Sequence, residues 1–179
     1  PMHSVANKRI LWITETAVMT ALLIVLQTAA KAGGQYVTGS CVNAVLAVSV
    51  LAVGAWSGVV VALLSPFFAF LLGIGPQLLP IVPSIAVGNL VFVLILGLLA
   101  GERETPLWRS GAAWVLAAGA KFAVLYLLVV KLLCTVLPLK EPRIATFSIM
   151  FSYPQLVTAL VGGAVGLLLA PALRRAIRR

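Results

Sequence analysis

The chain is poor in charged residues, and above all in acidic ones. Charged residues make up 9% of its 179 residues, against about 25% in a typical soluble domain. Aspartate is absent, and the carboxylate side chains are Glu15, Glu102, Glu104 and Glu141. This is little material for paired-carboxylate or carboxylate-metal chemistry, so an intramembrane enzyme with acidic metal ligands fits the sequence poorly.

Histidine and cysteine are nearly absent as well. His3 is the single histidine, which excludes His-based zinc motifs and Ser-His-Asp triads by count. Cys41 and Cys134 lack CxxC spacing and are expected to pack as small apolar side chains. We therefore expect no catalytic residue, no metal and no cofactor.

Apolar residues dominate what is present. They make up 62% of the chain, and the mean hydropathy is +1.14. The net charge of +9 would suit nucleic-acid binding only if the basic residues formed one footprint, but they lie in short runs between long apolar stretches. The expected partner is the lipid bilayer, not nucleic acid.

The apolar stretches predict one all-α transmembrane domain over 1–179. Residues 1–9 are read as a cytoplasmic leader, too short and polar for a signal peptide. A spanning helix needs about 20 residues, and six spans fit. They cover about 10–30, 40–54, 57–73, 83–100, 109–134 and 154–173. Prolines in the apolar connection 135–153 argue against continuous helix there, and Pro66 predicts a kink in the third span.

The distribution of lysine and arginine predicts the orientation. With the N-terminus inside, eight basic residues face the cytoplasm and four face outward. The inner set is Lys8, Arg9, Arg103, Arg109, Arg174, Arg175, Arg178 and Arg179, and the outer set is Lys31, Lys131, Lys140 and Arg143. Both termini are therefore predicted to be cytoplasmic, in the cytoplasmic membrane of a bacterium.

Lys121 is the ionisable residue that lies deepest in a predicted span. It is twelve residues from Arg109 and thirteen from Cys134, or about 18 Å from either end of its helix, which is too far for its side chain to reach an interface. Its charge is expected to face the bundle interior. Three readings remain open: a bound anionic or strongly polar ligand, a long ion pair with Glu15, or a buried deprotonated amine.

Polar side chains on other spans gather at the same depth. Asn43, Asn89 and Gln155 lie in the outer halves of three predicted spans, where Gln35 and Tyr36 precede the second span in the first outer connection. Interhelical hydrogen bonding is the alternative role for each amide. Together with Lys121 they form a candidate binding pocket.

Small residues recur at a spacing of four. Ala17 and Ala21 make such a pair in the first span, and Gly162 and Gly166 make another in the last. Small-xxx-small pairs allow close helix approach, either within the bundle or with another protein.

The chain resembles the substrate-binding S components of energy-coupling factor (ECF) transporters. The resemblance covers nearly the whole chain and rests on six spans in under 200 residues together with several motifs. These are AVMTA at 17–21, GSCVN at 39–43, LSPFFA at 64–69, GIGP at 73–76, PSIAVGN at 83–89 and YPQL at 153–156. It implies an S-component bundle in which Ala17 and Ala21 dock a transmembrane coupling subunit, and in which Asn89, Lys121 and Gln155 line an outer pocket.

The resemblance also implies a function. The chain would be the high-affinity binding subunit of an ATP-driven importer for a small vitamin or related micronutrient. Because the sequence has no GxxxxGK[ST] loop, ATP hydrolysis is expected in two cytoplasmic ATPase partners. The charge of Lys121 ranks carboxylates such as pantothenate or nicotinate above neutral compounds such as pyridoxine. A small stand-alone secondary carrier or channel is the alternative, although no matched halves are evident.

Overall fold

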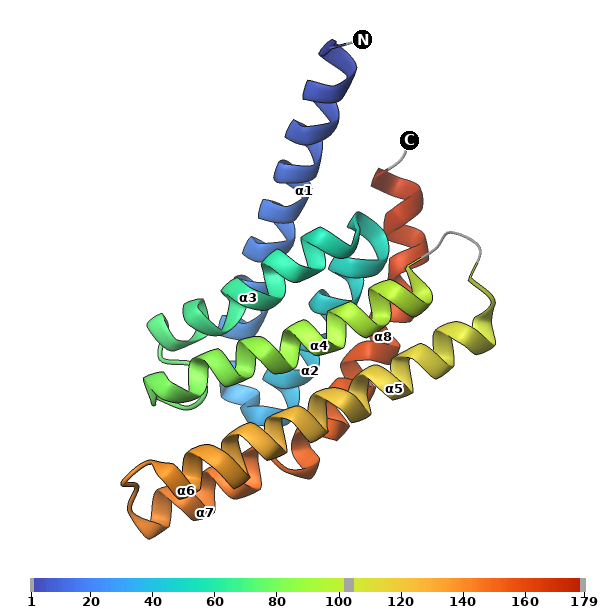
Figure 1. The fold of residues 1–179 in the computed structure, drawn as a ribbon. Helices are drawn as coiled ribbons and strands as arrows, with labels where there is room; N and C mark the ends of the chain where they lie inside the picture. Colours follow the sequence, from blue (N-terminus) through green and yellow to red (C-terminus); the bar gives the residue numbers. More distant parts are fainter. Residues whose placement is uncertain (1, 102–104, 178–179) are drawn as a thin grey trace.

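A computed structural model describes residues 2–101 and 105–177 of the chain, with side chains from residue 7 onward. The described residues form helices joined by short connections, without a strand among them (Figure 1). The long helices are α1 (Met2–Ala29), α2 (Gly34–Val48), α3 (Ala55–Leu71), α4 (Val82–Ala100), α5 (Leu107–Leu125) and α8 (Tyr153–Ile177). The short segments are η1 (Ala30–Gly33), η2 (Ser49–Val53), η3 (Leu79–Ile81), η4 (Tyr126–Leu133), α6 (Cys134–Val136) and α7 (Glu141–Met150).

The described helices coincide with the apolar stretches of the chain, because backbone groups in hydrocarbon must be satisfied internally. Within the described residues, four helical stretches are long and apolar enough to cross a membrane, and α3 is apolar but has only 17 residues. The short second span gains length because α2 begins at Gly34 and continues without interruption into η2. α1 begins at Met2, so most of the segment read as a leader is helical. The count of six crossings stays a prediction.

The connection expected over 135–153 is more regular than its prolines indicated. α6 ends at Val136 and an extended break follows, but the ten residues from Glu141 to Met150 form α7. Pro142 occupies the first turn of α7, where a missing backbone N–H costs nothing. No continuous helix runs through 135–153, but α7 was not anticipated, because a proline at the start of a helix favours the helix that it would break farther inside.

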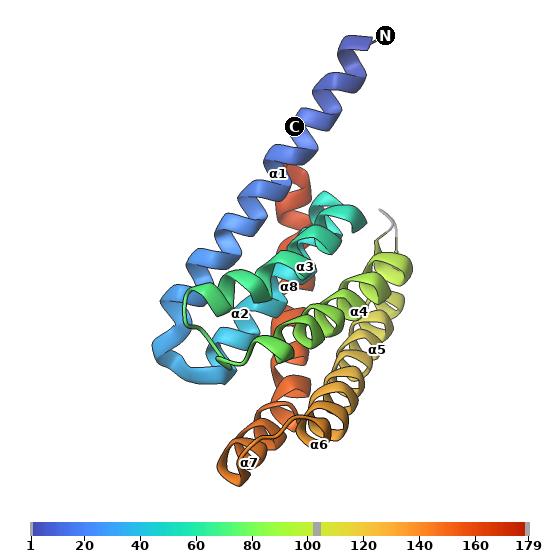
Figure 2. The same cartoon turned by 60° about the vertical axis from the view of Figure 1, so that its left-hand side comes forward.

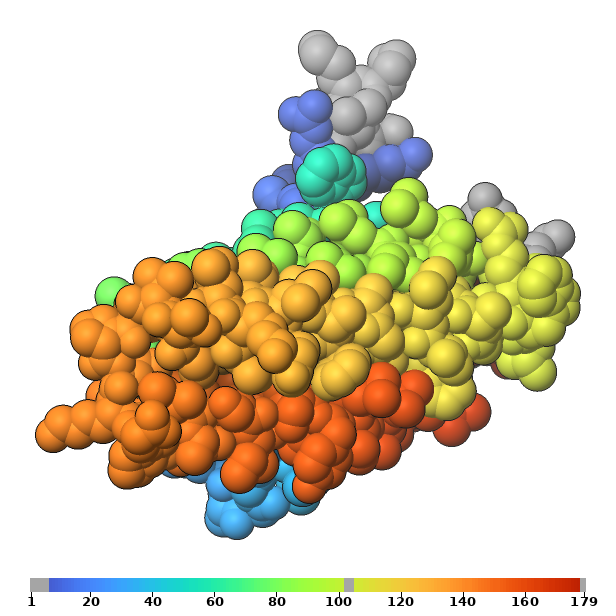
Figure 3. Space-filling view, turned by 60° about the horizontal axis from the view of Figure 1, so that its bottom comes forward, coloured from blue at the N-terminus to red at the C-terminus, as the bar shows by residue number. Residues whose placement is uncertain are grey.

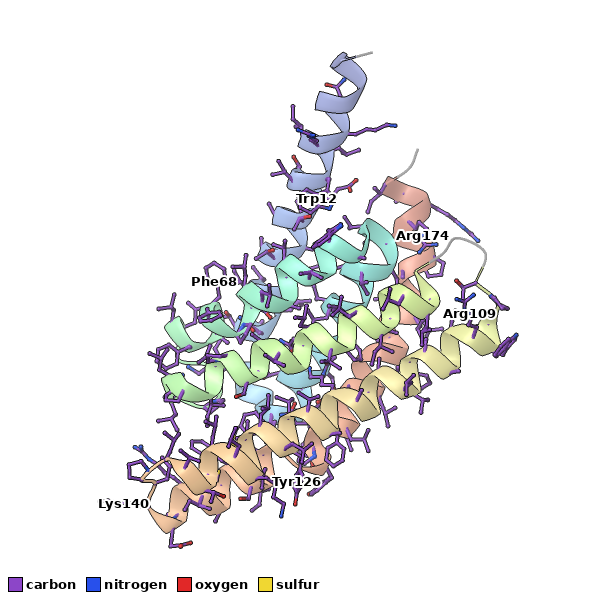
Figure 4. All side chains as sticks on the ribbon, viewed as in Figure 1. Trp12, Phe68, Arg109, Tyr126, Lys140 and Arg174 are labelled. Carbon is purple, nitrogen blue, oxygen red and sulfur yellow. The ribbon has the colours of Figure 1, made fainter. Side chains whose placement is uncertain are left out.

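The helix ends and the connections between helices gather at two ends of the molecule (Figures 1 and 2). The start of α1, the end of α8, the end of α4 and the start of α5 lie at the first, here called the termini end. η1, the α3–α4 connection and the α6–α7 turn lie at the second, called the loop end. Arg109 and Arg174 are at the termini end and Lys140 is at the tip of the loop end (Figure 4). Arg103, Arg178 and Arg179, which entered the charge count, lie outside the described residues.

α8 packs along α2 through two glycines. A Cβ atom at Gly162 would meet the Cβ of Asn43 at 2.6 Å, and one at Gly166 would meet the Ala44 carbonyl oxygen at 3.0 Å. The Gly162 and Gly166 pair therefore serves internal packing, which brings the backbones of α2 and α8 together. α5 covers the other side of α8, and the two helices lie side by side over one face of the molecule (Figure 3).

Candidate functional site

A cavity of about 280 Å³ lies near the loop end, between the last turn of α1, the first half of α2, the loop-end parts of α3 to α5 and the α7–α8 junction. Most of its wall is apolar, from side chains such as Phe70, Ile85 and Phe151. The polar residues that line it are Gln27, Lys31, Gln35, Thr38, Asn43, Ser65, Asn89, Lys121 and Gln155. A mainly apolar wall with a few polar groups is the usual make-up of a site for a small organic molecule.

Lys121 carries a buried amino group at this cavity. Only 3% of the residue is exposed, and its Nζ donates to Asn43 Oδ1 at 2.6 Å and to Asn89 Oδ1 at 2.7 Å. The Nζ also lies 5.6 Å from the centre of the Phe92 ring, within range of a cation–π interaction. Lys121 thus joins α5 to α2 and α4 through two amide oxygens, and the ion pair with Glu15 is not formed.

The two asparagines are oriented by their own hydrogen bonds. Asn43 Nδ2 donates to the Gly39 carbonyl at 2.9 Å and to Thr158 Oγ1 at 3.4 Å. Asn89 Nδ2 donates to Ser65 Oγ at 3.3 Å. Because each amide nitrogen is occupied, each amide oxygen is turned to Lys121.

The amino group of Lys121 has no carboxylate partner in the described part of the chain. An ammonium group has three N–H donors, and within the described part of the chain two of them have partners. Lys31 is a second amino group at the cavity, and no carboxylate side chain is among the lining residues. A buried cation needs a counter-charge or dense hydrogen bonding, so the cavity favours an anion.

Two glutamines close the cavity at the α7–α8 junction. Gln35 Nε2 donates to the Met150 carbonyl at 2.5 Å, and Gln155 Nε2 donates to the same oxygen at 3.1 Å. The start of α2 and the start of α8 are thereby held to the end of α7. Met150 and Phe151 lie in the cavity wall beside them.

The structure brings five of the six predicted pocket residues to one cavity: Gln35, Asn43, Asn89, Lys121 and Gln155. Tyr36 is the exception. It is 46% exposed, does not line the cavity, and interacts with the side chain of Tyr153 instead. Its neighbour Gln35 points inward because successive residues of a helix point in different directions.

Sequence reasoning missed Gln27 and Lys31. Gln27 continues the buried stripe of α1, formed by Thr16, Met19 and Leu23 at spacings of three and four. This periodicity was a signal that its amide faces the bundle. Lys31, an exposed residue at the edge of the cavity, entered only the charge count, because the sequence does not tell which residues of a connection border a cavity.

Ala17 and Ala21 lie on a different face of α1, where both are exposed. None of the described helices covers this pair. Among the described residues there is also no cluster of three or more histidine, cysteine, aspartate or glutamate side chains that could hold a metal ion.

The chain is similar to one known protein family. A family model for the substrate-specific component of ECF transporters matches residues 12–174, which include every cavity residue. No curated protein and no solved structure matches the chain.

Proposed function

The chain belongs to the family of substrate-specific components of ECF transporters, and from that premise we propose that it captures a small water-soluble vitamin or related micronutrient that carries a carboxylate. Members of this family are substrate-binding membrane subunits of transporters and not enzymes. The cavity near the loop end is the site at which we propose that the ligand binds.

The observation that carries this proposal is the buried amino group of Lys121, which has no carboxylate partner among the described residues. Its Nζ is held by Asn43 and Asn89 with one N–H left over, in a cavity whose wall has no carboxylate. A carboxylate would supply the missing charge and accept the third hydrogen bond. Pantothenate and nicotinate carry such a group, and neutral pyridoxine does not.

The proposed orientation puts the cavity on the outer side of a bacterial cytoplasmic membrane. The count of lysine and arginine favours a cytoplasmic termini end, and the cavity lies near the opposite end. A multi-pass chain in this orientation would take its ligand from outside the cell.

The first experiment identifies the ligand. Protein purified in detergent and then denatured should release one small carboxylic acid in an amount close to that of the protein, as measured by mass spectrometry. A parallel purification from cells without the protein is the control. Release of a neutral or cationic compound instead would contradict the proposed carboxylate.

The proposed transport partners are one transmembrane coupling subunit and two cytoplasmic ATPases. The sequence offers no phosphate-binding loop of its own, so the energy for import would come from these partners. The exposed pair Ala17 and Ala21 is the proposed docking surface for the coupling subunit, since small side chains allow close approach of another helix.

Replacing Ala17 and Ala21 by tryptophan is expected to separate assembly from binding. The added bulk would block close approach of the coupling subunit, while the cavity, which neither residue lines, would be unchanged. Co-purification with the coupling module should be lost, and ligand binding to the isolated subunit should persist.

Ala112→Trp on α5 is the matched control, because Ala112 is also exposed but lies on another helix. This variant should assemble normally. Loss of both assembly and binding in the Ala17 and Ala21 variant would mean that the pair supports the fold itself.

A further inference from the structure

Gln27 has a buried amide without a hydrogen-bond partner. The residue is 2% exposed, it lines the cavity, and its Nε2 meets no acceptor among the described residues. A buried polar group left unsatisfied is costly. A native structure keeps such a group for a reason.

The other side-chain amides of the cavity have hydrogen-bond acceptors in the protein. The side-chain nitrogens of Gln35, Asn43, Asn89 and Gln155 all donate to protein acceptors. Gln27 is thus the one amide nitrogen of the cavity wall, as far as the structure describes it, that has no protein acceptor at all. The terminal torsion of a glutamine side chain is soft, so rotation about it can turn the N–H groups toward the cavity.

Gln27 and Lys121 approach the cavity from opposite walls. α1 packs against α2 and α3, whereas α5 packs against α4 and α8. Figure 2 shows α1 on one side of the molecule and α5 on the other. A ligand held by Lys121 at its acid group therefore extends toward Gln27 with a different part of its structure.

We propose that Gln27 is a specificity-determining residue that donates a hydrogen bond to an uncharged acceptor of the ligand, separate from the acid group held by Lys121. This inference rests on the proposed function and narrows the ligand class. The ligand is an organic acid with a second, neutral acceptor such as a ring nitrogen, a carbonyl or a hydroxyl. Acids with a purely hydrocarbon body bind more weakly.

Nicotinate and benzoate test the proposal as probes. They share a carboxylate on a six-membered ring, and only nicotinate has a ring nitrogen that accepts a hydrogen bond. The wild-type subunit in detergent should bind nicotinate more tightly than benzoate. Gln27→Met should weaken nicotinate binding about tenfold, leave benzoate binding unchanged and so remove the preference. Equilibrium titration measures both affinities.

The melting temperature of the ligand-free subunit gives a second, independent measurement. Gln27→Met removes an unsatisfied polar group, so the melting temperature should rise by about 3 °C. Gln155→Met removes an amide that donates to Met150 and should lower it. Gln27→Glu retains the shape of the side chain and replaces the donor by an acceptor. It should therefore weaken nicotinate binding at least as much as Gln27→Met does.

Thr28→Val is the control for both measurements, since Thr28 is the exposed neighbour of Gln27 and its hydroxyl donates only to the Ile24 carbonyl. It should leave affinity and melting temperature unchanged. An unaltered nicotinate preference in folded Gln27→Met, or a fall in its melting temperature, would overturn the proposal. If the wild type binds neither acid, the direction of the melting shift decides the role of Gln27, and the carboxylate specificity is decided separately by the compound that co-purifies.

Discussion

Lys121→Met is expected to weaken binding of a carboxylate ligand by about 2 kcal/mol or more, or roughly 30-fold, while the chain stays folded. Methionine has similar length and fits an apolar wall, but it supplies neither the charge nor the free N–H. The substitution leaves the oxygens of Asn43 and Asn89 without their donor. It also removes a desolvated cation, so the two effects on stability oppose each other.

Binding should be measured by equilibrium titration with the acid that co-purifies, after gel filtration has shown that the variant is monodisperse. Lys131→Met is the matched control, because Lys131 follows on the same helical stretch but is exposed and does not line the cavity. Its affinity should equal that of the wild type. Unchanged affinity in a folded Lys121→Met protein would refute the role of this residue in anion binding.

Gly162→Ala is expected to destabilise the subunit by about 3 kcal/mol, the upper range for overpacking in a close-packed interior. The added methyl group would collide with the Ser40 carbonyl and lie 2.6 Å from the Asn43 Cβ and 2.8 Å from the Ala44 backbone nitrogen. α2 would have to move away from α8. Asn43 would move with it, so the hydrogen bond to Lys121 and ligand binding should be lost together.

The same substitution at Gly119 on α5 is the control. A methyl group there meets nothing within 4 Å, and alanine is the better helix former by about 0.5–1 kcal/mol. Gly119→Ala should therefore raise the melting temperature slightly, while Gly162→Ala lowers it strongly. Equal melting temperatures for the two variants would show that α2 and α8 are not closely packed at Gly162.

Much of the fold follows from local properties of the sequence. Composition predicted a helical membrane protein, which is confirmed in this general form, and the family resemblance is confirmed by the match over residues 12–174. The depth of Lys121 and of the amides Asn43, Asn89 and Gln155 could be counted along each apolar stretch. Depth was enough to predict that they lie near one another, since side chains at one level of a small bundle share its interior.

Only the tertiary structure decided which of these side chains meet. Position along a helix is readable from the sequence, but the face that a residue presents depends on how each helix is rotated against its neighbours. For this reason the sequence left Glu15 as a possible partner for Lys121, whereas the structure has Asn43 and Asn89 in that role. For the same reason the sequence placed Tyr36 in the pocket and missed Gln27. The same rotation puts Gly162 and Gly166 against α2 and leaves Ala17 and Ala21 exposed, because a helix buries the face that its packed neighbours cover.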